Sequence, residues 1–265
     1  MYAFEYHRPG SVADAVALRR DRPEATYLAG GHTLVPTLKQ RLAMPSDMVD
    51  LNGIAELRQI REEGGRLVVG AMATHGEVTR SELVRSMIPG LAGLASWVGD
   101  AQVKNRGTIG GSIANNDPAA DYPAAVVGLN ATVKTDRREI PGDDFFLGMF
   151  ETALEEDELV TAIVFPRPER AAYAKFPNPA SRYAIVGVMV AQTGGGTRVA
   201  VTGAGPCVFR WPEAEQALGS NFSADALSNL TVSPDALNGD IHASAEYRAH
   251  LVKVMAQRAV KAAIG

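Results

Sequence analysis

The sequence predicts an α+β fold of three consecutive modules, and three observations indicate it. An apolar run, a helical stretch and a second apolar run follow one another within residues 25–50, the pattern of a parallel strand–helix–strand unit. Further strand-like runs then flank a helical region. Finally, two β-branched runs surround a glycine turn and precede a long amphipathic helix. We expect the modules to span residues 1–53, 54–172 and 173–265.

The first module begins with a helix that follows Ser11, a residue type favoured as an N-cap. The expected inner face of this helix consists of Val12, Ala15, Val16 and Leu18. A strand at residues 25–29 ends at a glycine pair, and a helix follows from Thr33, with Pro36 tolerable because it falls in the first turn. Its apolar face is expected to contain Leu34, Leu38 and Leu42. The run DMVDL predicts the second strand.

The second module is expected to open with a strand at residues 66–71. A helical stretch, SELVRSMIPGLAGLASWVG, is broken by Pro89 and Gly90, since proline disrupts a helix interior. The runs GLNATVKT and LVTAIVFP predict later strands. The proline-rich, charged segment PRPERAAYAKF is interpreted as a link to the third module.

The third module contains the clearest local signal, a hairpin in which AIVGVMVAQ and TRVAVTGAG flank TGGG. The final helical segment, ASAEYRAHLVKVMAQRAVKAAI, has one apolar stripe that we assign to the core. The stripe consists of Tyr247, Leu251, Val254, Met255 and Ala259.

Composition and charge restrict the classes of function. With 265 residues and a net charge of −4, and with no cluster of Lys and Arg, a nucleic-acid or anionic-membrane role has little support. No apolar run reaches the roughly 18–20 residues of a membrane span, and the N-terminus lacks the pattern of a signal peptide. We therefore expect a cytoplasmic protein. Cys207 is the single cysteine, so this chain cannot form an internal disulfide or ligate an iron–sulfur cluster through cysteines.

Two glycine pairs carry the main functional signal. The first glycine segment, LAGGHTLVP at residues 28–36, could be a tight turn, a metal site around His32, or bare backbone that faces a phosphate. The second glycine segment, NRGTIGGS at residues 105–112, repeats the pairing of two glycines with hydroxyl and apolar neighbours. Consecutive backbone N–H groups bind anions, and a dinucleotide's pyrophosphate can be held from both sides. Neither the Rossmann fingerprint nor a P-loop is present.

Less specific interpretations compete in three cases. His32 is a poor candidate for a metal ligand, because the remaining histidines show no ligand spacing. Asp117 and Asp121 could form an acid/base pair, but Pro118 makes Asp117 resemble a helix N-cap, which is the commoner arrangement. Cys207 is more simply explained as a small apolar residue behind a turn than as a reactive thiol.

Four segments, taken in order, resemble the FAD-binding medium subunit of molybdenum hydroxylases. They are LAGGHTLVPTLKQRLAMPSDMVDLNGI, VKNRGTIGGSIANNDPAADYP, DDFFLGMFETAL and ASRYAIVGV. This family includes the aerobic carbon-monoxide-dehydrogenase-type and xanthine-dehydrogenase-type enzymes. The C-terminal part is similar to the last domain of the same flavoproteins, so the resemblance covers essentially the whole chain. It implies a vanillyl-alcohol-oxidase-type (PCMH-type) FAD-binding domain of two subdomains, followed by a CO-dehydrogenase-flavoprotein-like α+β domain.

The resemblance also implies a set of FAD-binding residues. The pyrophosphate is expected on the two glycine segments, through Ala29, Gly30, Gly31, His32, Thr33 and Leu34 and through Thr108, Ile109, Gly110, Gly111 and Ser112. Asp121 corresponds to the family's aspartate near the ribityl hydroxyls, and Leu159 to an apolar residue beside the cofactor. Lys175 corresponds to a basic residue near the flavin ring, where a cation stabilises the anionic reduced form. Tyr183 is more simply a strand aromatic than a flavin contact.

The implied function is electron transfer within a larger enzyme. Substrate oxidation would take place at the molybdenum cofactor of a large molybdopterin subunit, and electrons would pass through [2Fe–2S] clusters of a small iron–sulfur subunit to FAD in this chain and on to an external acceptor. The assembly would be a heterotrimer, and a dimer of heterotrimers. The alternatives are a stand-alone FAD-dependent oxidase or dehydrogenase and a non-enzymatic nucleotide-binding module. The first alternative is weakened because the third module is small for a substrate-covering domain of roughly 200 residues.

Overall fold

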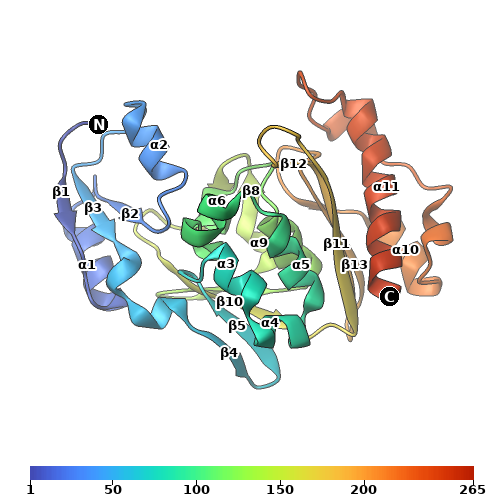
Figure 1. Cartoon of the computed structure of the whole chain (residues 1–265), viewed down its shortest axis with the longest axis horizontal. Coiled ribbons are helices and arrows are strands. Elements are labelled where there is room, and N and C mark those ends of the chain that lie inside the picture. Colours follow the sequence, from blue (N-terminus) through green and yellow to red (C-terminus); the bar gives the residue numbers. More distant parts are fainter.

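Three sheets, each packed on apolar side chains, succeed one another along the chain. The computed structural model describes residues 1–265. The N-terminal sheet lies at one end of the long axis, and the C-terminal helix α11 (Ala245–Ile264) lies at the other (Figure 1). The division into units at residues 53 and 172 stays a prediction.

The first sheet is parallel and has the order β1-β3-β2. Its elements are β1 (Glu5–His7), α1 (Val12–Asp21), β2 (Thr26–Leu28), α2 (Leu34–Lys39) and β3 (Asp47–Asp50), with 3₁₀ turns at Leu51–Gly53 and Ala55–Arg58. The strand–helix–strand unit is thereby confirmed, and β1 is an addition that the sequence did not indicate. Ser11 caps α1 by accepting a hydrogen bond from the N–H of Asp14, as predicted. Ala15 and Val16 are buried, with Val12 and Leu18 packed beside them.

Helix α2 is shorter than the periodicity suggested. It ends at Lys39, and Leu42 is 78% exposed, so the expectation that Leu42 continues the apolar face is wrong. Arg41 adopts a left-handed conformation (φ 60°), and the N–H of Leu42 donates to the carbonyl of Thr37. These two features form a Schellman C-cap, which turns the chain out of the helix one residue before the third leucine.

The second sheet is antiparallel, with the order β4-β5-β10-β6-β7. Its strands are β4 (Ile60–Glu63), β5 (Arg66–Gly70), β6 (Thr132–Thr135), β7 (Glu139–Pro141) and β10 (Val160–Pro166). The helices of this region are α3 (His75–Arg80), α4 (Glu82–Met87), α5 (Pro89–Trp97), α6 (Ala101–Arg106), α7 (Ile109–Asn115), α8 (Tyr122–Gly128) and α9 (Gly142–Phe145). A small hairpin, β8 (Phe146–Gly148) and β9 (Glu151–Thr152), lies beside them.

Most expectations for this region are confirmed. The strands β5 and β10 lie where predicted, and the helical stretch is interrupted between α4 and α5, where Pro89 occupies the first turn of α5. The strand expected over residues 128–135 is reduced to β6, because Gly128 and Leu129 form the end of α8. Helix α3 begins with a capping box between Thr74 and Glu77, which fixes the entry to the helices.

The third sheet is antiparallel, with the order β11-β12-β13-β14. It consists of β11 (Arg170–Pro177), β12 (Ala184–Thr193), β13 (Gly196–Thr202) and β14 (Phe209–Arg210), and it is covered by α10 (Pro212–Ser220) and α11, with 3₁₀ turns at Ala224–Leu227 and Pro234–Ala236. The predicted hairpin is confirmed as β12 and β13. On α11 the stripe is confirmed at Leu251, Met255 and Ala259, whereas Tyr247 is 43% exposed.

The expected link at residues 166–176 is wrong, because β11 occupies most of it and pairs with β12 along its whole length. One face of this sheet contributes Tyr173, Met189 and Ala191 to the apolar cluster of the second module. The opposite face packs on α11 through residues such as Val188 and Val190. The third sheet therefore has apolar side chains on both faces and packs on the second module with one face and on α11 with the other.

None of the helices combines the length and the apolar character needed to cross a bilayer.

Candidate functional site

The two glycine segments lie in contact. Gly30 packs against the backbone that precedes α7, so a Cβ atom at position 30 would lie 2.1 Å from the carbonyl oxygen of Arg106 and 2.8 Å from the Cα of Gly107. A Cβ on Gly111 would lie 3.5 Å from the Cβ of Ala29. Only a residue without a side chain allows the first of these approaches.

The first glycine segment offers unused backbone donors. The N–H groups of Gly30, Gly31, His32 and Thr33 donate to no acceptor in the protein. Gly31 has φ +76°, a left-handed conformation that favours glycine, and His32 and Thr33 are exposed. Helix α2 has only six residues, so the donors matter here more than any helix dipole. A row of free N–H groups at the surface can bind an anion.

The second glycine segment contributes differently from what we expected. The N–H of Ile109 donates to the carbonyl of Ala73 (3.0 Å), and that of Gly110 donates to the carbonyl of Ala71 (2.8 Å). The expectation that Gly110 lends its own N–H group to a ligand is therefore wrong. The absence of a side chain serves packing instead, because a Cβ there would lie 2.5 Å from the Cβ of Ala71.

Helix α7 starts at this segment, because the side chain of Thr108 accepts a hydrogen bond from the N–H of Gly111 (3.1 Å) and caps the helix. A bridge between Thr74 and Thr108 ties the start of α3 to the same place. The hydroxyl of Ser112 makes no hydrogen bond within the protein and is partly exposed. It is a free polar group of α7 at the end of the second segment.

His75 lies directly behind the two segments. Its ring is 5% exposed and packs on Tyr122 at 5.3 Å between centroids, and a Cβ on Gly107 would lie 2.5 Å from its Nε2. Burial, together with the nearby His32, lowers the pKa of His75 to about 4, so the ring is neutral near pH 7. Its Nδ1 atom is buried without a hydrogen-bond partner.

Asp121 and Lys175 form a buried ion pair. The Lys175 Nζ donates to Asp121 Oδ2 at 2.9 Å and to the carbonyl of Trp97 at 3.4 Å, and the hydroxyl of Tyr173 donates to Asp121 Oδ1 at 2.5 Å. The lysine side chain has no exposed surface, and that of the aspartate is 6% exposed. Burial raises the pKa of Asp121, while Lys175 and Tyr173 oppose that rise.

Asp117 and Leu159 are two further residues that the sequence singled out. Asp117 is not a helix N-cap, because its carboxylate accepts a hydrogen bond from the N–H of Ala119 in a turn, and α8 begins only at Tyr122. No hydrogen bond joins Asp117 to Asp121. Leu159 is 5% exposed and packs in the apolar cluster of the first module, at the junction with the second.

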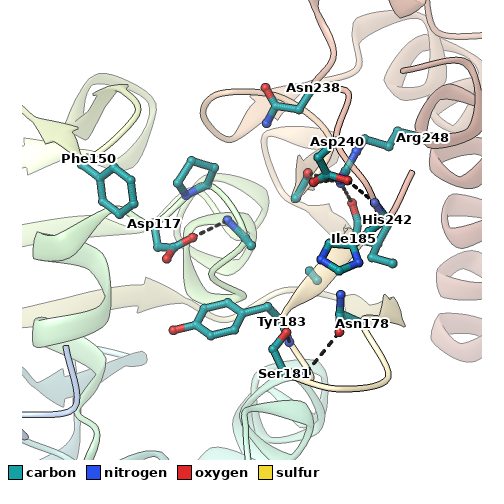
Figure 2. Close-up of a pocket in the computed structure, with 14 residues that line it drawn as sticks. Asp117, Phe150, Asn178, Ser181, Tyr183, Ile185, Asn238, Asp240, His242 and Arg248 are labelled. Carbon is teal, nitrogen blue, oxygen red and sulfur yellow. Dashed lines mark hydrogen bonds and ion pairs between the residues drawn. The ribbon is translucent and has the colours of Figure 1, made fainter. Parts of the chain in front are cut away.

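A pocket of about 370 Å³ lies between the second and third modules. Figure 2 shows Phe150 and Asp117 on one side and Asp240, His242 and Arg248 on the other, with Tyr183 at the floor between them. Tyr183 is 48% exposed, and burial together with the carboxylates of Asp117 and Asp121 raises its pKa. The pocket also includes Pro118, Ala119, Asn178, Ser181, Ala184, Ile185, Gly203 and Asn238.

Sequence reasoning missed Tyr173 and the contribution of Trp97. The signal for Tyr173 was its spacing from Lys175, since residues i and i+2 of a strand point to the same face. That signal was overlooked because the segment was interpreted as a link. The carbonyl of Trp97 carries no side-chain signal at all.

Two family models together cover nearly the whole chain. Residues 2–168 match the FAD binding domain in molybdopterin dehydrogenase, and residues 171–263 match the CO dehydrogenase flavoprotein C-terminal domain. The chain belongs to the FAD-binding medium subunits of molybdenum hydroxylases. This medium-subunit family accounts for the α+β architecture, in which an FAD-binding domain precedes a flavoprotein C-terminal domain.

Relatives of the medium-subunit family match over almost their full length. The carbon monoxide dehydrogenase medium chain of Hydrogenophaga pseudoflava is 36% identical, with 98% of this chain and 96% of the relative covered. The nicotine 6-hydroxylase medium subunit of Paenarthrobacter nicotinovorans is 34% identical, with 97% and 96% covered. Among solved structures, a Cu,Mo-CO dehydrogenase chain superposes with a TM-score of 0.90 at 35% identity, covering 98% of this chain and 97% of that one.

Membership makes this medium subunit part of an oxidoreductase, and its cofactor is FAD. The molybdenum cofactor and the iron–sulfur clusters of such enzymes belong to other subunits, so small and large partner subunits are implied. The four free N–H groups beside the contact of the two glycine segments fit the pyrophosphate of FAD, because each is an unused donor, and the missing side chain of Gly30 lets the two segments approach.

Proposed function

We propose that this medium subunit binds FAD with its pyrophosphate on the two glycine segments and passes electrons from a partner's [2Fe–2S] clusters to an external acceptor. The observation that carries the proposal is the row of unused N–H groups from Gly30 to Thr33 at the contact with the second segment. Two phosphates carry two negative charges, and N–H donors to charged groups form the stronger kind of hydrogen bond.

The proposed FAD-binding residues fall into two groups. On the first segment they are Ala29, Gly30, Gly31, His32, Thr33 and Leu34, and on the second they are Thr108, Ile109, Gly110, Gly111 and Ser112. The first group supplies N–H donors, which is supported by their lack of other acceptors. The second group supplies a close-packed backbone and the free hydroxyl of Ser112, because the N–H groups of Ile109 and Gly110 are already engaged.

Asp121, Leu159 and Lys175 complete the proposed set. FAD, when bound, supplies the redox chemistry, and the residues around it set its charge balance. The Lys175 ammonium favours negative charge on a reduced flavin, and Asp121 can accept hydrogen bonds from sugar hydroxyls. Leu159 lies at the junction of the first two modules, where it excludes water. Because Lys175 and Asp121 are paired, their combined charge is close to neutral in this structure.

The proposed route of electrons needs partner chains. Cys207 is the single cysteine, whereas a [2Fe–2S] cluster takes four protein ligands, so clusters must be supplied from outside. No three His, Cys, Asp or Glu side chains lie together in a way that could hold a metal ion. We propose a heterotrimer with an iron–sulfur small subunit and a molybdopterin large subunit, assembled as a dimer of heterotrimers. We also propose a cytoplasmic location, which an unpaired cysteine favours.

Reconstitution tests the proposal. The purified chain should carry one non-covalent FAD, and acid precipitation should release all of the yellow colour. Dithionite should bleach the bound flavin, whereas organic substrates and CO should bleach it only after the two partner chains are added. Bleaching by a substrate in the isolated chain would instead support a stand-alone flavoenzyme. A colourless chain that does not take up FAD would overturn the proposal altogether.

A further inference from the structure

We propose that Tyr173 is a positioning residue that sets the charge of the Asp121–Lys175 pair, and that Gly187 provides the space for its hydroxyl. The inference rests on the proposed function, since it assumes that this ion pair faces FAD. Neither Tyr173 nor Gly187 is among the proposed FAD-binding residues, and both act through Asp121.

The side chains of Tyr173 and Lys175 both donate hydrogen bonds to the carboxylate of Asp121. Both residues lie on the same face of β11, and both point to the residue that precedes α8. Tyr173 donates to Oδ1 at 2.5 Å and Lys175 donates to Oδ2 at 2.9 Å, so each oxygen of Asp121 has its own donor. The side chain of Asp121, at the N-cap of α8, makes no capping hydrogen bond, so both of its oxygens are available to β11.

Gly187 of β12 leaves space for the hydroxyl of Tyr173. It lies opposite Lys175 in the register of β11 and β12. A Cβ at position 187 would lie 2.0 Å from the hydroxyl oxygen of Tyr173 and 2.8 Å from its Cζ. Any other residue would therefore push the hydroxyl away from Asp121. The glycine in the middle of a buried strand, which is unfavourable for the strand itself, is explained by this contact.

Removing the hydroxyl has a definite electrostatic consequence. Without Tyr173, Oδ1 of Asp121 is a buried acceptor with no donor, and the hydrogen bond that helps to keep the carboxylate charged is lost. The protonated form of Asp121 is then favoured, and a neutral Asp121 no longer balances the Lys175 ammonium. More positive charge remains to stabilise a reduced, anionic flavin, so the midpoint potential of the flavin rises.

The test compares two phenol-to-phenyl substitutions in the chain loaded with FAD. In Tyr173→Phe we expect a higher two-electron midpoint potential and a Kd for FAD that rises roughly tenfold, because a neutral Asp121 is a weaker acceptor for sugar hydroxyls. Tyr122→Phe is the matched control, because the Tyr122 hydroxyl is fully buried, belongs to the residue next to Asp121 and has no hydrogen-bond partner. Its potential should equal that of the unmodified chain. Potentials are measured by spectroelectrochemistry and Kd values by flavin fluorescence.

A second variant keeps the inference testable if the first one folds poorly. Gly187→Ala should also raise the potential, although Tyr173 is still present, because the new methyl group displaces the hydroxyl from Asp121. Unchanged potentials in both Tyr173→Phe and Gly187→Ala, with FAD bound, would overturn this inference and leave the proposed function intact. A loss of FAD binding by the unmodified chain would overturn the proposed function itself.

Discussion

Glycine at position 30 is required by a backbone contact rather than by a turn. Its missing side chain leaves room for the carbonyl of Arg106, so the two glycine segments can touch. Gly31 is required for another reason, its left-handed φ of +76°. Two neighbouring glycines thus satisfy two separate physical demands, which a sequence pattern alone does not distinguish.

The contact at Gly30 leads to a first prediction. Gly30→Ala places a Cβ 2.1 Å from the Arg106 carbonyl oxygen, so the segments must separate. We expect FAD affinity to fall at least about tenfold, since each lost charge-assisted hydrogen bond is worth roughly 1.5–3 kcal/mol. Gly10→Ala is the control, because a Cβ there meets nothing within 4 Å. Equal Kd values for the two variants, measured by flavin fluorescence, would contradict the proposed location of the pyrophosphate.

His75 makes a prediction about pH. Its pKa of about 4 in the folded chain lies below the ordinary 6.5, so only the unfolded chain binds the proton between these values. Its contribution to stability is therefore complete above about pH 6.5, declines as the pH falls, and is lost near pH 4. The decline amounts to about 3 kcal/mol, from 1.36 kcal/mol per pKa unit.

Urea unfolding of the isolated chain at pH 7 and pH 4.5 measures this effect. His75→Phe keeps an aromatic ring on Tyr122 but removes the titration, so its pH dependence should be smaller than that of the unmodified chain. His250→Gln, at an exposed position, should retain the full dependence. If His75→Phe and the unmodified chain lose the same stability on acidification, the buried imidazole is not the group responsible.

At the scale of secondary-structure elements, α5 and β11 form one of the contacts that join the second and third modules, beside those of α8 with β12 and β13. Gly90 of α5 packs on the backbone of β11, so a Cβ would lie 2.6 Å from the carbonyl oxygen of Ala171. Gly93, on the same helix, faces open space, with nothing within 4 Å of a Cβ. The two glycines of one helix therefore have opposite requirements.

This contrast gives a prediction with an internal control. Gly93→Ala should raise the free energy of unfolding by about 0.5–1 kcal/mol, because alanine favours the helix. Gly90→Ala should lower it by at least about 1–3 kcal/mol, since the helix must move off the strand. Chemical denaturation of both variants decides the matter. Stabilisation by Gly90→Ala would mean that α5 and β11 are not in close contact.

The success of prediction from sequence differed among elements for physical reasons. The β12–β13 hairpin and helix α1 were predictable, because turn chemistry and capping are local. Strand β11 was not, because prolines and charges mark its start and its pairing partner follows later in the chain. For the site, the shared pattern of the glycine segments predicted that both hold one pyrophosphate group. Their direct contact, the engagement of the Gly110 N–H and the role of Tyr173 depend on tertiary neighbours.

For the whole molecule, the third sheet is the decisive feature. Tyr173, Met189 and Ala191 belong to the same apolar cluster as the second module, while the other face packs on α11. Separating the C-terminal module would expose that cluster to water, at roughly 25 cal/mol per Å² of apolar surface. The modules are thus distinct in the sequence but coupled in stability.

This coupling predicts one cooperative transition for the second and third modules. Differential scanning calorimetry of the full chain should show them unfolding together, and Gly90→Ala should move the whole transition to lower temperature. A control substitution in the first module, Gly10→Ala, should leave it in place. Two resolved transitions, only one of which responds to Gly90→Ala, would show that the third sheet does not couple the unfolding of the two modules.

The buried ion pair also imposes an order on biosynthesis. The carboxylate of Asp121 leaves the ribosome first, and its ammonium partner Lys175 follows 54 residues later. At about 5–20 residues per second, the nascent chain spends roughly 3–10 seconds with an acidic group that it cannot bury without a counter-charge. During that interval the start of α8 must stay in water, and β11 can close over it only once it has been translated. With FAD bound beside this pair, as we propose, cofactor loading is expected only after Lys175 has been translated.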